Sequence, residues 1–487
     1  MEVAGIGVKL NKIYSKNTLA TNLAGFGYST IISVAPMFVV IGAVLLMQIF
    51  LGFSRVGYAV RELYSCTVLY IFIFSLLTAS PFNAVLSKYL SDIIYLDKYD
   101  DILPCYYVGM AMNILLSAPL GIVFCLREHF VGGVEPMYVL LGYCGYIALT
   151  LTFYSMLYLS ICKVYPIISG FFTAGMTVTV LLSLMLVYWF RVSVTYAMLA
   201  SLDVGFLVIA SLEYALVKSY FRENSGRYRE VFRYFKKYWQ LVLTNFLYTL
   251  GLYMHNFVFW TTDMHLVVAK SFVCMTSYDM ATCLAMFTNL SASVIFISRV
   301  EMYFHERYKA YSEAVTGGRG MDIRETKSRM FEQLSDELVN LVRIQFIVTV
   351  MLFFLCMIFM PQFGFGGLVM QIYPCLTVGY FILFVMYAAI IFLYYFNDLK
   401  GAVLTSLAFV LATLAGSLVA IHLTPMWYGI GLVFGAFVGW SFSYIRLRWV
   451  ERRLDIHIFC KGNLMKRGEG KKPSNLVYKR GKERKGA

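Results

Sequence analysis

The chain has 487 residues, 60% of them hydrophobic and 14% charged, and a mean hydropathy of +0.70. A soluble domain must carry a wetted surface, so these values exclude a soluble globular protein. The net charge of +14 would suit a nucleic-acid-binding protein, but the basic residues lie beside apolar runs, where lipid headgroups would meet them. We therefore expect anionic lipids, and no nucleic acid, as the partners of these charges.

Twelve apolar stretches with few charges follow one another along the chain. Each is about 17 to 25 residues long, which is the length that a helix needs to cross a membrane. The predicted fold class is therefore an all-α polytopic membrane protein with about twelve transmembrane helices. The stretches are 27–51, 65–86, 104–126, 137–161, 164–188, 194–217, 239–261, 278–298, 344–360, 374–396, 402–422 and 427–445.

Basic residues are distributed unequally between alternate connections. With a cytoplasmic N-terminus, 36 of the 41 lysines and arginines lie on the inner side of the membrane and 5 on the outer side. Because Lys and Arg favour the cytoplasmic side, the positive-inside rule predicts that both termini are cytoplasmic. The five outer residues are Arg55, Arg61, Arg127, Arg191 and Lys270.

The basic segment 218–237 divides the apolar stretches into two sets of six. We predict an N-terminal six-helix bundle over residues 1–230, a C-terminal six-helix bundle over 231–450, and a basic cytoplasmic tail over 451–487 whose end is disordered. An even number of spans gives both halves the same orientation, as in transporters that are built from parallel repeats.

Two further segments show helical patterns outside the apolar stretches. Residues 5–17 place three apolar residues on one face among lysines, which suits a helix in the inner headgroup region. The predicted cytoplasmic loop 301–343 is interrupted at glycines and resumes with Asp322 and Glu325 at the spacing of a capping box. An apolar stripe follows, for which packing on the bundle or membrane is favoured over partner binding. It comprises Phe331, Leu334, Leu338 and Leu341.

The extramembrane segments show no sign of catalysis. They lack a phosphate-binding glycine loop, a nucleophile elbow, an HExxH motif and paired catalytic carboxylates, and none is long enough to bury its own core. The ten cysteines lack metal-ligand spacing and are interpreted as small buried hydrophobes, with no disulfide indicated. We predict a protein that is not an enzyme and uses neither a cofactor nor a metal.

Charged residues at membrane depth are costly, so they usually face the bundle interior or a watery cavity. Asp203 lies deepest, Glu213 shares its stretch, and Arg61 and Asp279 lie at the outer ends of two other stretches. We predict that Arg61, Asp203 and Asp279 line a substrate pathway. An interfacial location is an equally good interpretation for each charged residue except Asp203. A candidate cytoplasmic gate closes the second and eighth stretches, and consists of Lys88, Asp92, Arg299 and Glu301.

Three tyrosines on the tenth stretch form a ladder. Tyr380, Tyr387 and Tyr394 recur every seven residues and so share one helix face, with about 20° of drift per step. Their rings would suit the stacking of sugars along a polymer path. Packing between helices, with the hydroxyl groups bonded to neighbouring carbonyls, is the alternative and is slightly favoured.

Several stretches in fixed order resemble the PelG family, the inner-membrane export component of the Pel exopolysaccharide system. The resemblance covers about residues 3 to 450 and leaves out only the basic tail. The stretches are AGIGVKLNKI (4–13), GFGYSTIISVAPM (25–37), YLSDIIYLDKYDDILP (89–104), LYTLGLYMHNFVFW (247–260), YDMATCLAMFTNL (278–290), ISRVEMYFHERYKAYSEAV (297–315) and YYFNDLKGAVLTSLAFVLATL (394–414).

The resemblance implies a multi-pass protein of the bacterial cytoplasmic membrane in the multidrug, oligosaccharidyl-lipid and polysaccharide (MOP) flippase superfamily. Two six-helix bundles would enclose a central cleft. The partners that the resemblance implies for this protein are a polysaccharide substrate rich in N-acetylhexosamine, a cytosolic glycosyltransferase and membrane proteins that respond to cyclic di-GMP. The chain departs from the family pattern at His255 and Asn256, where an acidic and basic pair is expected, so that charge pair is not carried over.

We therefore predict an exporter of a nascent exopolysaccharide, powered either by polymer growth or by the membrane potential and a proton gradient. Asp203 is the candidate for proton coupling, because a buried acid can take up and release a proton during a transport cycle. A lipid-linked oligosaccharide flippase is the first alternative, although Arg61 alone offers little for a diphosphate. A cation-coupled drug antiporter and a scaffold that assembles the synthase without transport are the others.

Overall fold

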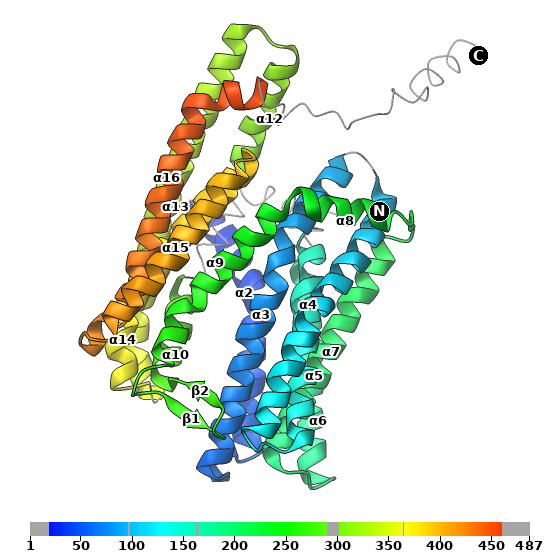
Figure 1. The fold of residues 1–487 in the computed structure, drawn as a ribbon, viewed down its shortest axis with the longest axis vertical. Coiled ribbons are helices and arrows are strands. Elements are labelled where there is room, and N and C mark those ends of the chain that lie inside the picture. Colours follow the sequence, from blue (N-terminus) through cyan, green and yellow to red (C-terminus); the bar gives the residue numbers. More distant parts are fainter. Residues whose placement is uncertain (1–18, 96–97, 162–164, 290–300, 364, 460–487) are drawn as a thin grey trace.

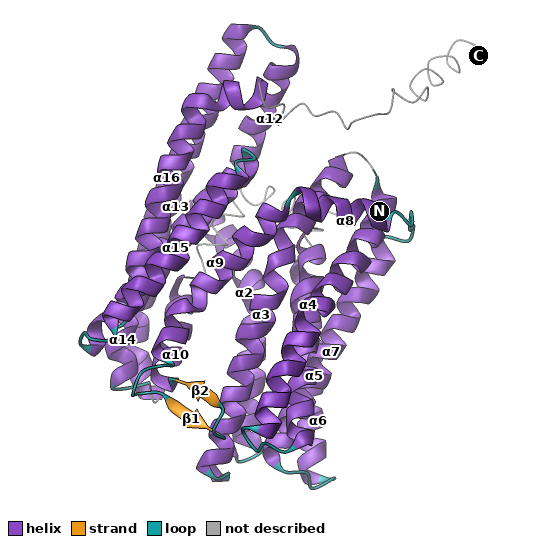
Figure 2. Ribbon diagram, in the orientation of Figure 1, coloured by secondary structure: helices purple, strands orange, loops and turns teal. Residues whose placement is uncertain are grey.

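The computed structural model describes residues 19–95, 98–161, 165–289, 301–363 and 365–459. Within these ranges the chain forms fourteen α-helices, four short 3-10 helices and one two-stranded β-hairpin. Figure 2 shows that the long helices run roughly side by side, with the hairpin at one end of the molecule. The predicted amphipathic helix 5–17 and residues 460–487 of the predicted tail lie outside the described residues.

The first half of the chain consists of long helices that turn sharply at short connections. A 3-10 helix, η1 (Phe53–Arg55), follows the first of them, and η2 (Tyr99–Asp101) leads into the third. The long helices are α2 (Leu19–Phe50), α3 (Tyr58–Tyr95), α4 (Ile102–Phe130), α5 (Pro136–Ile161), α6 (Tyr165–Tyr188) and α7 (Val194–Tyr220).

The second half begins with a short amphipathic helix and contains the hairpin. The hairpin strands are antiparallel, with Leu266 opposite Cys274 and Val268 opposite Phe272. The elements are α8 (Tyr228–Lys237), α9 (Trp239–Phe259), β1 (Leu266–Val268), β2 (Phe272–Cys274), α10 (Thr276–Asn289), α12 (Glu301–Gly317), α13 (Gly320–Phe359), η4 (Met360–Phe363), α14 (Leu368–Tyr395), α15 (Leu399–Ala420), η5 (Pro425–Trp427) and α16 (Ile430–Phe459).

Each of the twelve predicted apolar stretches overlaps a helix of the structure. Among the described residues, nine helical segments are long and apolar enough to cross a membrane, and the residues 35–50 of α2 form a shorter apolar helix. The prediction of an all-α, multi-pass membrane protein is confirmed. The nine segments contain α3, α4, α5, α6, α7, α13, α14, α15 and α16.

Helix α9 is not among these nine segments. It carries polar residues that are buried in the protein, among them Thr244, His255 and Asn256. Both α3 and α15 pack against it, so much of its surface meets protein. A helix inside a bundle can hold polar groups because they find partners on neighbouring helices.

Buried apolar side chains gather in two clusters. One consists almost entirely of residues from α2 to α9 and the other of residues from α9 to α16, each with a few members from the opposite half. Ile73 of α3, for example, belongs to the cluster of the second half, and Phe272 of β2 belongs to that of the first. The two halves therefore pack around separate cores and exchange side chains where they meet.

The contacts between the halves centre on α3. It packs along α9 and also touches both strands of the hairpin. In Figure 1, α13, α15 and α16 form one column and α3 to α7 the other, with the hairpin at the lower end beside α10. The hairpin thus belongs to the second half in sequence but packs on the first half in space.

The predicted loop 301–343 is a helical hairpin instead of an open loop. Helix α12 begins at its first residue, and α13 runs unbroken through its second part into the predicted stretch 344–360. The 40 residues of α13 make a helix about 60 Å long, so it extends past the apolar layer. At the upper end of Figure 1, the α12–α13 hairpin projects beyond the other helices.

The start of α13 differs from the prediction in its capping residues. The Asp322 carboxylate accepts the backbone N–H of Arg319 at 2.9 Å, so Arg319 is the N-cap residue and the predicted pair with Glu325 is wrong. The predicted apolar stripe does pack on the bundle: Phe331 is buried and stacks on Phe396, with ring centroids 5.2 Å apart. The predicted packing of this stripe is confirmed.

Candidate functional site

Asp203 lies inside the first half, where α5 and α7 come close together. Its side chain is only 4% exposed, and Oδ1 lies directly against the Cα of Gly145 on α5. A Cβ at position 145 would collide with this oxygen, so the glycine makes the space that the carboxylate fills. Neither carboxylate oxygen accepts a hydrogen bond from the described residues. Burying an ionised carboxylate without hydrogen-bond donors costs much free energy. Acids that are buried in this way at membrane depth usually have a function.

Two buried tyrosines lie within electrostatic range of Asp203. Tyr64 of α3 is 1% exposed, and Tyr138 of α5 donates its hydroxyl to Thr67 at 3.4 Å. The Tyr64 hydroxyl is also buried without a partner in the described part of the chain. Asp203 and Tyr64 are therefore two buried side chains within electrostatic range of each other whose oxygen atoms have no hydrogen-bond partner among the described residues.

Glu213 is a second buried acid on α7. It is fully buried, neither of its oxygens has a hydrogen-bond partner among the described residues, and it lies within electrostatic range of Tyr106 on α4. The sequence places Glu213 near the end of a predicted span, where an interfacial position is an equally good interpretation. Its burial instead puts two unpartnered acids inside the first half.

Asp279 has the opposite environment. Its carboxylate accepts hydrogen bonds from the Asn256 side chain at 2.7 Å, from the Trp260 indole at 3.0 Å, and from the backbone N–H of Met275 at 3.2 Å. All three donors belong to the second half of the chain. The residue is thus a fixed junction between α9 and α10.

His255 lies beside this junction and joins three helices. Its Nδ1 is 2.9 Å from the Tyr278 hydroxyl, and its Nε2 is 3.4 Å from the Tyr380 hydroxyl. These three side chains are fully buried. At the two positions where the resemblance expects a charge pair, this chain therefore places Asn256 on a carboxylate and His255 between tyrosines.

The tyrosine ladder of α14 faces α9 along its whole length. Tyr380 contacts His255, Tyr387 stacks on Tyr248 with centroids 4.7 Å apart, and Tyr394 donates its hydroxyl to Asn245 at 3.2 Å. Tyr380 is fully buried, whereas Tyr387 and Tyr394 are half-buried. In this conformation the ladder forms a seam between two helices.

The candidate gate residues on α3 pack on the linker helix α8. Asp92 accepts the hydroxyl of Tyr234 at 2.5 Å, and the Lys88 ammonium lies 5.3 Å from the ring centre of Tyr238. Arg299 lies outside the described residues, as does the side chain of Glu301, the first residue of α12. The described part of the candidate gate therefore ties the end of α3 to the segment that connects the halves.

Arg61 lies at the opposite end of α3 and turns toward the adjacent loop. Its guanidinium donates to the Ser54 carbonyl at 3.4 Å and lies 5.9 Å from the ring centre of Tyr58. Asp203, Asp279 and Arg61 therefore contact three separate sets of residues. The structure does not bring them together around one site.

The β1–β2 hairpin forms contacts that the sequence did not predict. Val273 and the Tyr70 hydroxyl of α3 exchange two hydrogen bonds, of 2.8 Å and 3.1 Å, and Ser271 donates its hydroxyl to Glu128 of α4. The Tyr70 ring stacks on Trp260, with centroids 5.1 Å apart and planes 8° apart. We call the hairpin with Tyr70, Trp260 and Glu128 the clasp, because it joins the two halves at one end.

The sequence offers one weak signal for this hairpin. Two runs rich in β-branched and aromatic residues, LVV and FVC, are separated by three residues. The connection contains Ala269 and Lys270, both with positive φ, and lacks the Asn-Gly or Asp-Gly pair that usually marks such a turn. The usual sequence signature of a tight turn therefore does not reveal this hairpin.

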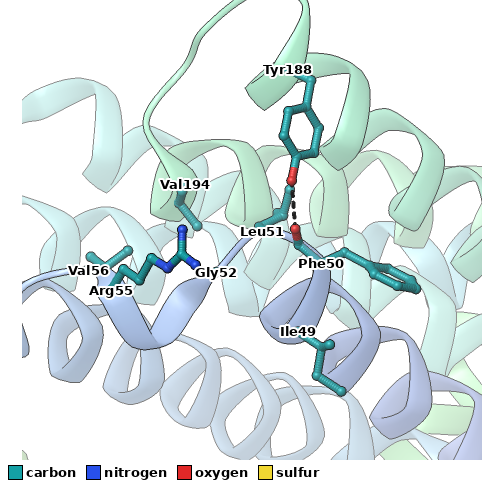
Figure 3. Close-up of a pocket in the computed structure, with 8 residues that line it drawn as sticks. All are labelled: Ile49, Phe50, Leu51, Gly52, Arg55, Val56, Tyr188 and Val194. Carbon is teal, nitrogen blue, oxygen red and sulfur yellow. Dashed lines mark hydrogen bonds between the residues drawn. The ribbon is translucent and has the colours of Figure 1, made fainter.

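A separate pocket of about 460 Å³ opens at the same end of the first half (Figure 3). The Tyr188 hydroxyl donates to the Phe50 carbonyl across it at 2.7 Å. None of the predicted site residues lines it. Among the described residues, no group of three or more His, Cys, Asp or Glu side chains is placed to hold a metal ion. The pocket is lined by Ile49, Phe50, Leu51, Gly52, Arg55, Val56, Tyr188 and Val194.

The fold is similar to that of MATE-family transporters of the MOP superfamily. The chain superposes on an outward-facing MATE-family multidrug resistance transporter with a TM-score of 0.61 at 12% identity, covering 88% of this chain and 96% of that one. An inward-facing MATE-family structure gives 0.55 at 13% identity, covering 87% and 96%. A MOP-superfamily transporter from Pyrococcus furiosus, whose binding pocket is described as reversed in polarity, gives 0.58 at 14%, covering 88% and 96%. At these identities the likeness concerns the fold.

The sequence match is more specific. Residues 3–459 match the family described as "PelG: Putative exopolysaccharide Exporter (EPS-E)", so the chain belongs to the PelG family. A comparison with curated proteins finds no match. The family is one of exporters and the structural neighbours are transporters, which places this chain among transport proteins and apart from enzymes.

Proposed function

We propose that this protein exports a nascent exopolysaccharide, Pel-like and rich in N-acetylhexosamine, across the bacterial cytoplasmic membrane. The observation that carries the proposal is the family match over residues 3–459, which includes both halves. The MOP-type fold supports it, because transporters of this architecture move solutes between two packed halves.

The halves, residues 1–230 and 231–450, would then move as two bodies that open alternately toward either side. With both termini cytoplasmic, the clasp lies on the outer side of the membrane and is closed in this structure. The inner side carries α8 and the α12–α13 hairpin. The protein described here would thus be closed to the outside.

Asp203 is our candidate for coupling export to a proton. It is buried, without hydrogen-bond donors among the described residues, and packed between α5 and α7 of the first half. Binding or release of a proton changes its charge by one unit, and that change is costly enough in a buried site to alter the packing. We place the polymer path along the seam of α9 and α14, where Tyr387 and Tyr394 are half-buried and Tyr380 is fully buried.

The cytoplasmic side offers surfaces for the proposed partners. The α12–α13 hairpin extends away from the bundle, and its tip residues Arg319, Met321 and Asp322 are exposed. We propose that a cytosolic glycosyltransferase and membrane proteins responsive to cyclic di-GMP contact this side, so that polymer passes directly from synthesis to export. Exposed basic residues of α8, such as Arg229 and Arg233, would meet anionic lipids.

Complementation tests the function. Cells that contain the glycosyltransferase but lack this protein are expected to release no polymer, and release should return when the chain is supplied, as measured with an N-acetylhexosamine-binding lectin outside the cells. Accumulation of a lipid-linked oligosaccharide instead would indicate a flippase, and a change in drug resistance alone would indicate an antiporter. Normal polymer release without the protein would contradict export.

The orientation has its own test. The Gly320→Cys variant places a thiol at the tip of the α12–α13 hairpin, where nothing lies within 4 Å of the added Cβ. A membrane-impermeant maleimide should label it only after the cells are permeabilised, with the wild-type chain as the background. Strong labelling in intact cells would contradict the cytoplasmic location of the hairpin.

A further inference from the structure

Two cysteines that are far apart in the sequence meet inside the clasp. Cys66 of α3 and Cys274 of β2 are separated by 208 positions, and their sulfur atoms are 2.7 Å apart. Both are free thiols and only 2% exposed. In the sequence they look like small buried hydrophobes, because their spacing suggests no pairing.

The clasp holds these two residues in place from both sides. Tyr70 lies one helical turn from Cys66 on the same face of α3, and it bonds both backbone groups of Val273, the residue before Cys274. The Tyr70 ring lies between Trp260 and Phe272, with centroid distances of 5.1 Å and 5.2 Å. The proximity of the thiols is therefore part of a packed interface between α3 and β2.

The hairpin is too small to be stable without that interface. Each strand has three residues, and a two-stranded hairpin of this size is marginal in water. Its stability comes from docking on α3 and α4 through Tyr70, Phe124 and Glu128. A covalent bond at this point would decide whether the hairpin stays docked.

We propose that Cys66 and Cys274 form a disulfide bond that fastens the β1–β2 hairpin to α3 and keeps the outer side of the transporter closed. The location of the pair in the oxidising outer compartment rests on the proposed function and its orientation. There, disulfides form and persist. Once formed, the bond would fit the docked clasp with only a small approach of the two sulfur atoms, which lie 2.7 Å apart there.

The bond forms by thiol–disulfide exchange with an oxidised dithiol oxidoreductase of that compartment. When the hairpin lifts from α3, the thiolate of one cysteine attacks the enzyme's disulfide, a mixed disulfide forms, and an enzyme thiolate leaves. The sulfur of the second cysteine then attacks the mixed disulfide and releases the enzyme with both of its sulfurs reduced. The two protons of the cysteine thiols balance those of the enzyme's new dithiol, so the transporter loses two electrons and two protons and the enzyme gains them.

Peptide mapping of the full chain tests the bond directly. After free thiols are alkylated without reductant, trypsin yields peptide 62–88, with Cys66 alone, and peptide 271–299, with Cys274 and Cys283. We expect these peptides to be linked in protein from oxidising conditions and separated by reductant. The Cys283→Ser variant should keep the link and Cys274→Ser should lose it. Fully alkylated cysteines after treatment with copper phenanthroline would overturn the proposal.

Export measured with and without reductant tests the lock. We expect wild-type cells to export at least about tenfold less polymer when oxidised than when reduced, because the bond removes the outward-open state. The Cys66→Ser and Cys274→Ser variants should export equally in both conditions. Cys105→Ser is the matched control, since this buried cysteine contacts the Tyr158 hydroxyl at 3.5 Å instead of a second thiol, and it should retain the response.

The two readouts separate the possible failures. A linked pair with export that does not respond to reductant would overturn the lock while leaving the bond. A linked pair in cells that never release polymer, reduced or oxidised, would count against the proposed function and not against the bond. Loss of export in both serine variants at normal membrane levels would also overturn the lock, because removing the bond should leave the outer side free to open.

Discussion

The two halves of this protein bury an aspartate in contrasting ways. Asp279, in the second half, accepts hydrogen bonds from Asn256, Trp260 and a backbone N–H. Asp203, in the first half, is equally buried, but its two oxygens have no donor among the described residues. The same residue type therefore has hydrogen-bond donors in one half and is buried without them, among the described residues, in the other.

This difference separates a structural acid from a candidate working acid. A carboxylate that accepts three hydrogen bonds stabilises the elements that supply the donors. Substituting it destabilises the fold, because the buried donors are left unpaired. A buried carboxylate without donors contributes no such stability and is costly whenever it is ionised. We therefore expect substitutions of Asp203 to affect transport and those of Asp279 to affect folding.

The largest effect is expected for Asp203→Asn. Polymer export should fall by at least about tenfold, because a titratable acid at membrane depth is replaced by a neutral amide of similar size. The amount of protein in the membrane and its unfolding temperature should change little. Glu223→Gln, an exposed acid in the connection before α8, is the control and should export normally. Unchanged export by Asp203→Asn would show that the residue is structural.

The second effect concerns stability and the other aspartate. Asp279→Ala should lower the free energy of unfolding by about 2–3 kcal/mol, because the Asn256 amide and Trp260 indole lose their acceptor inside the protein. Thermal unfolding of the purified protein in detergent measures this change. Asp279→Asn retains one acceptor oxygen and should be less harmful. Equal stability of the alanine variant and the wild type would remove the contrast between the two aspartates.

A smaller effect tests the space around Asp203. Gly145→Ala should destabilise the protein by about 1–2 kcal/mol, because the added methyl group collides with the carboxylate. Gly170→Ala on α6 is the matched control, since nothing lies within 4 Å of its added Cβ and alanine favours a helix by about 0.5–1 kcal/mol. Unfolding temperatures that shift in opposite directions would support the close approach of α5 and α7. A stabilising Gly145→Ala would contradict it.

The smallest effect per residue is expected in the tyrosine ladder of the second half. The triple Tyr→Ala variant of Tyr380, Tyr387 and Tyr394 should export much less polymer, whereas the triple Phe variant keeps the rings and should lose much less. Each stacked ring contributes about 1 kcal/mol. Export and the unfolding temperature are measured on the same variants, which separates a role in binding the polymer from a role in packing against α9. Normal export by a folded alanine variant would show that the seam with α9 is packing alone.

The membrane-spanning helices were predictable because their signal is local. A stretch such as 402–422 must be apolar over its own length to cross a membrane, so the helix α15 can be anticipated without knowing its neighbours. Motifs in fixed order likewise predicted the PelG family, which the family match confirms. The charge asymmetry predicts, by the same local reasoning, that both termini are cytoplasmic. The orientation in the membrane remains a prediction.

The environment of each buried acid was not predictable in this way. In the sequence, both Asp203 and Asp279 are carboxylates in apolar stretches, the first deep in its stretch and the second at the outer end of another. Their difference comes from Gly145 on α5 and from Asn256 and Trp260 near the end of α9, which tertiary packing brings to them. Helical spacing shows which residues share a face, but it does not show which neighbouring helix that face meets.

The meeting of Cys66 with Cys274 depends even more on the tertiary structure. Apolar length and charge bias act within about twenty residues, so the sequence predicts the membrane-spanning helices but not that α13 begins as early as Gly320. Motifs in fixed order predict the family. The clasp joins positions 208 residues apart through a hairpin whose turn lacks the usual residues. Only the packing of α3 against the second half decided that these thiols face each other, because a contact between distant segments depends on how every helix between them is placed.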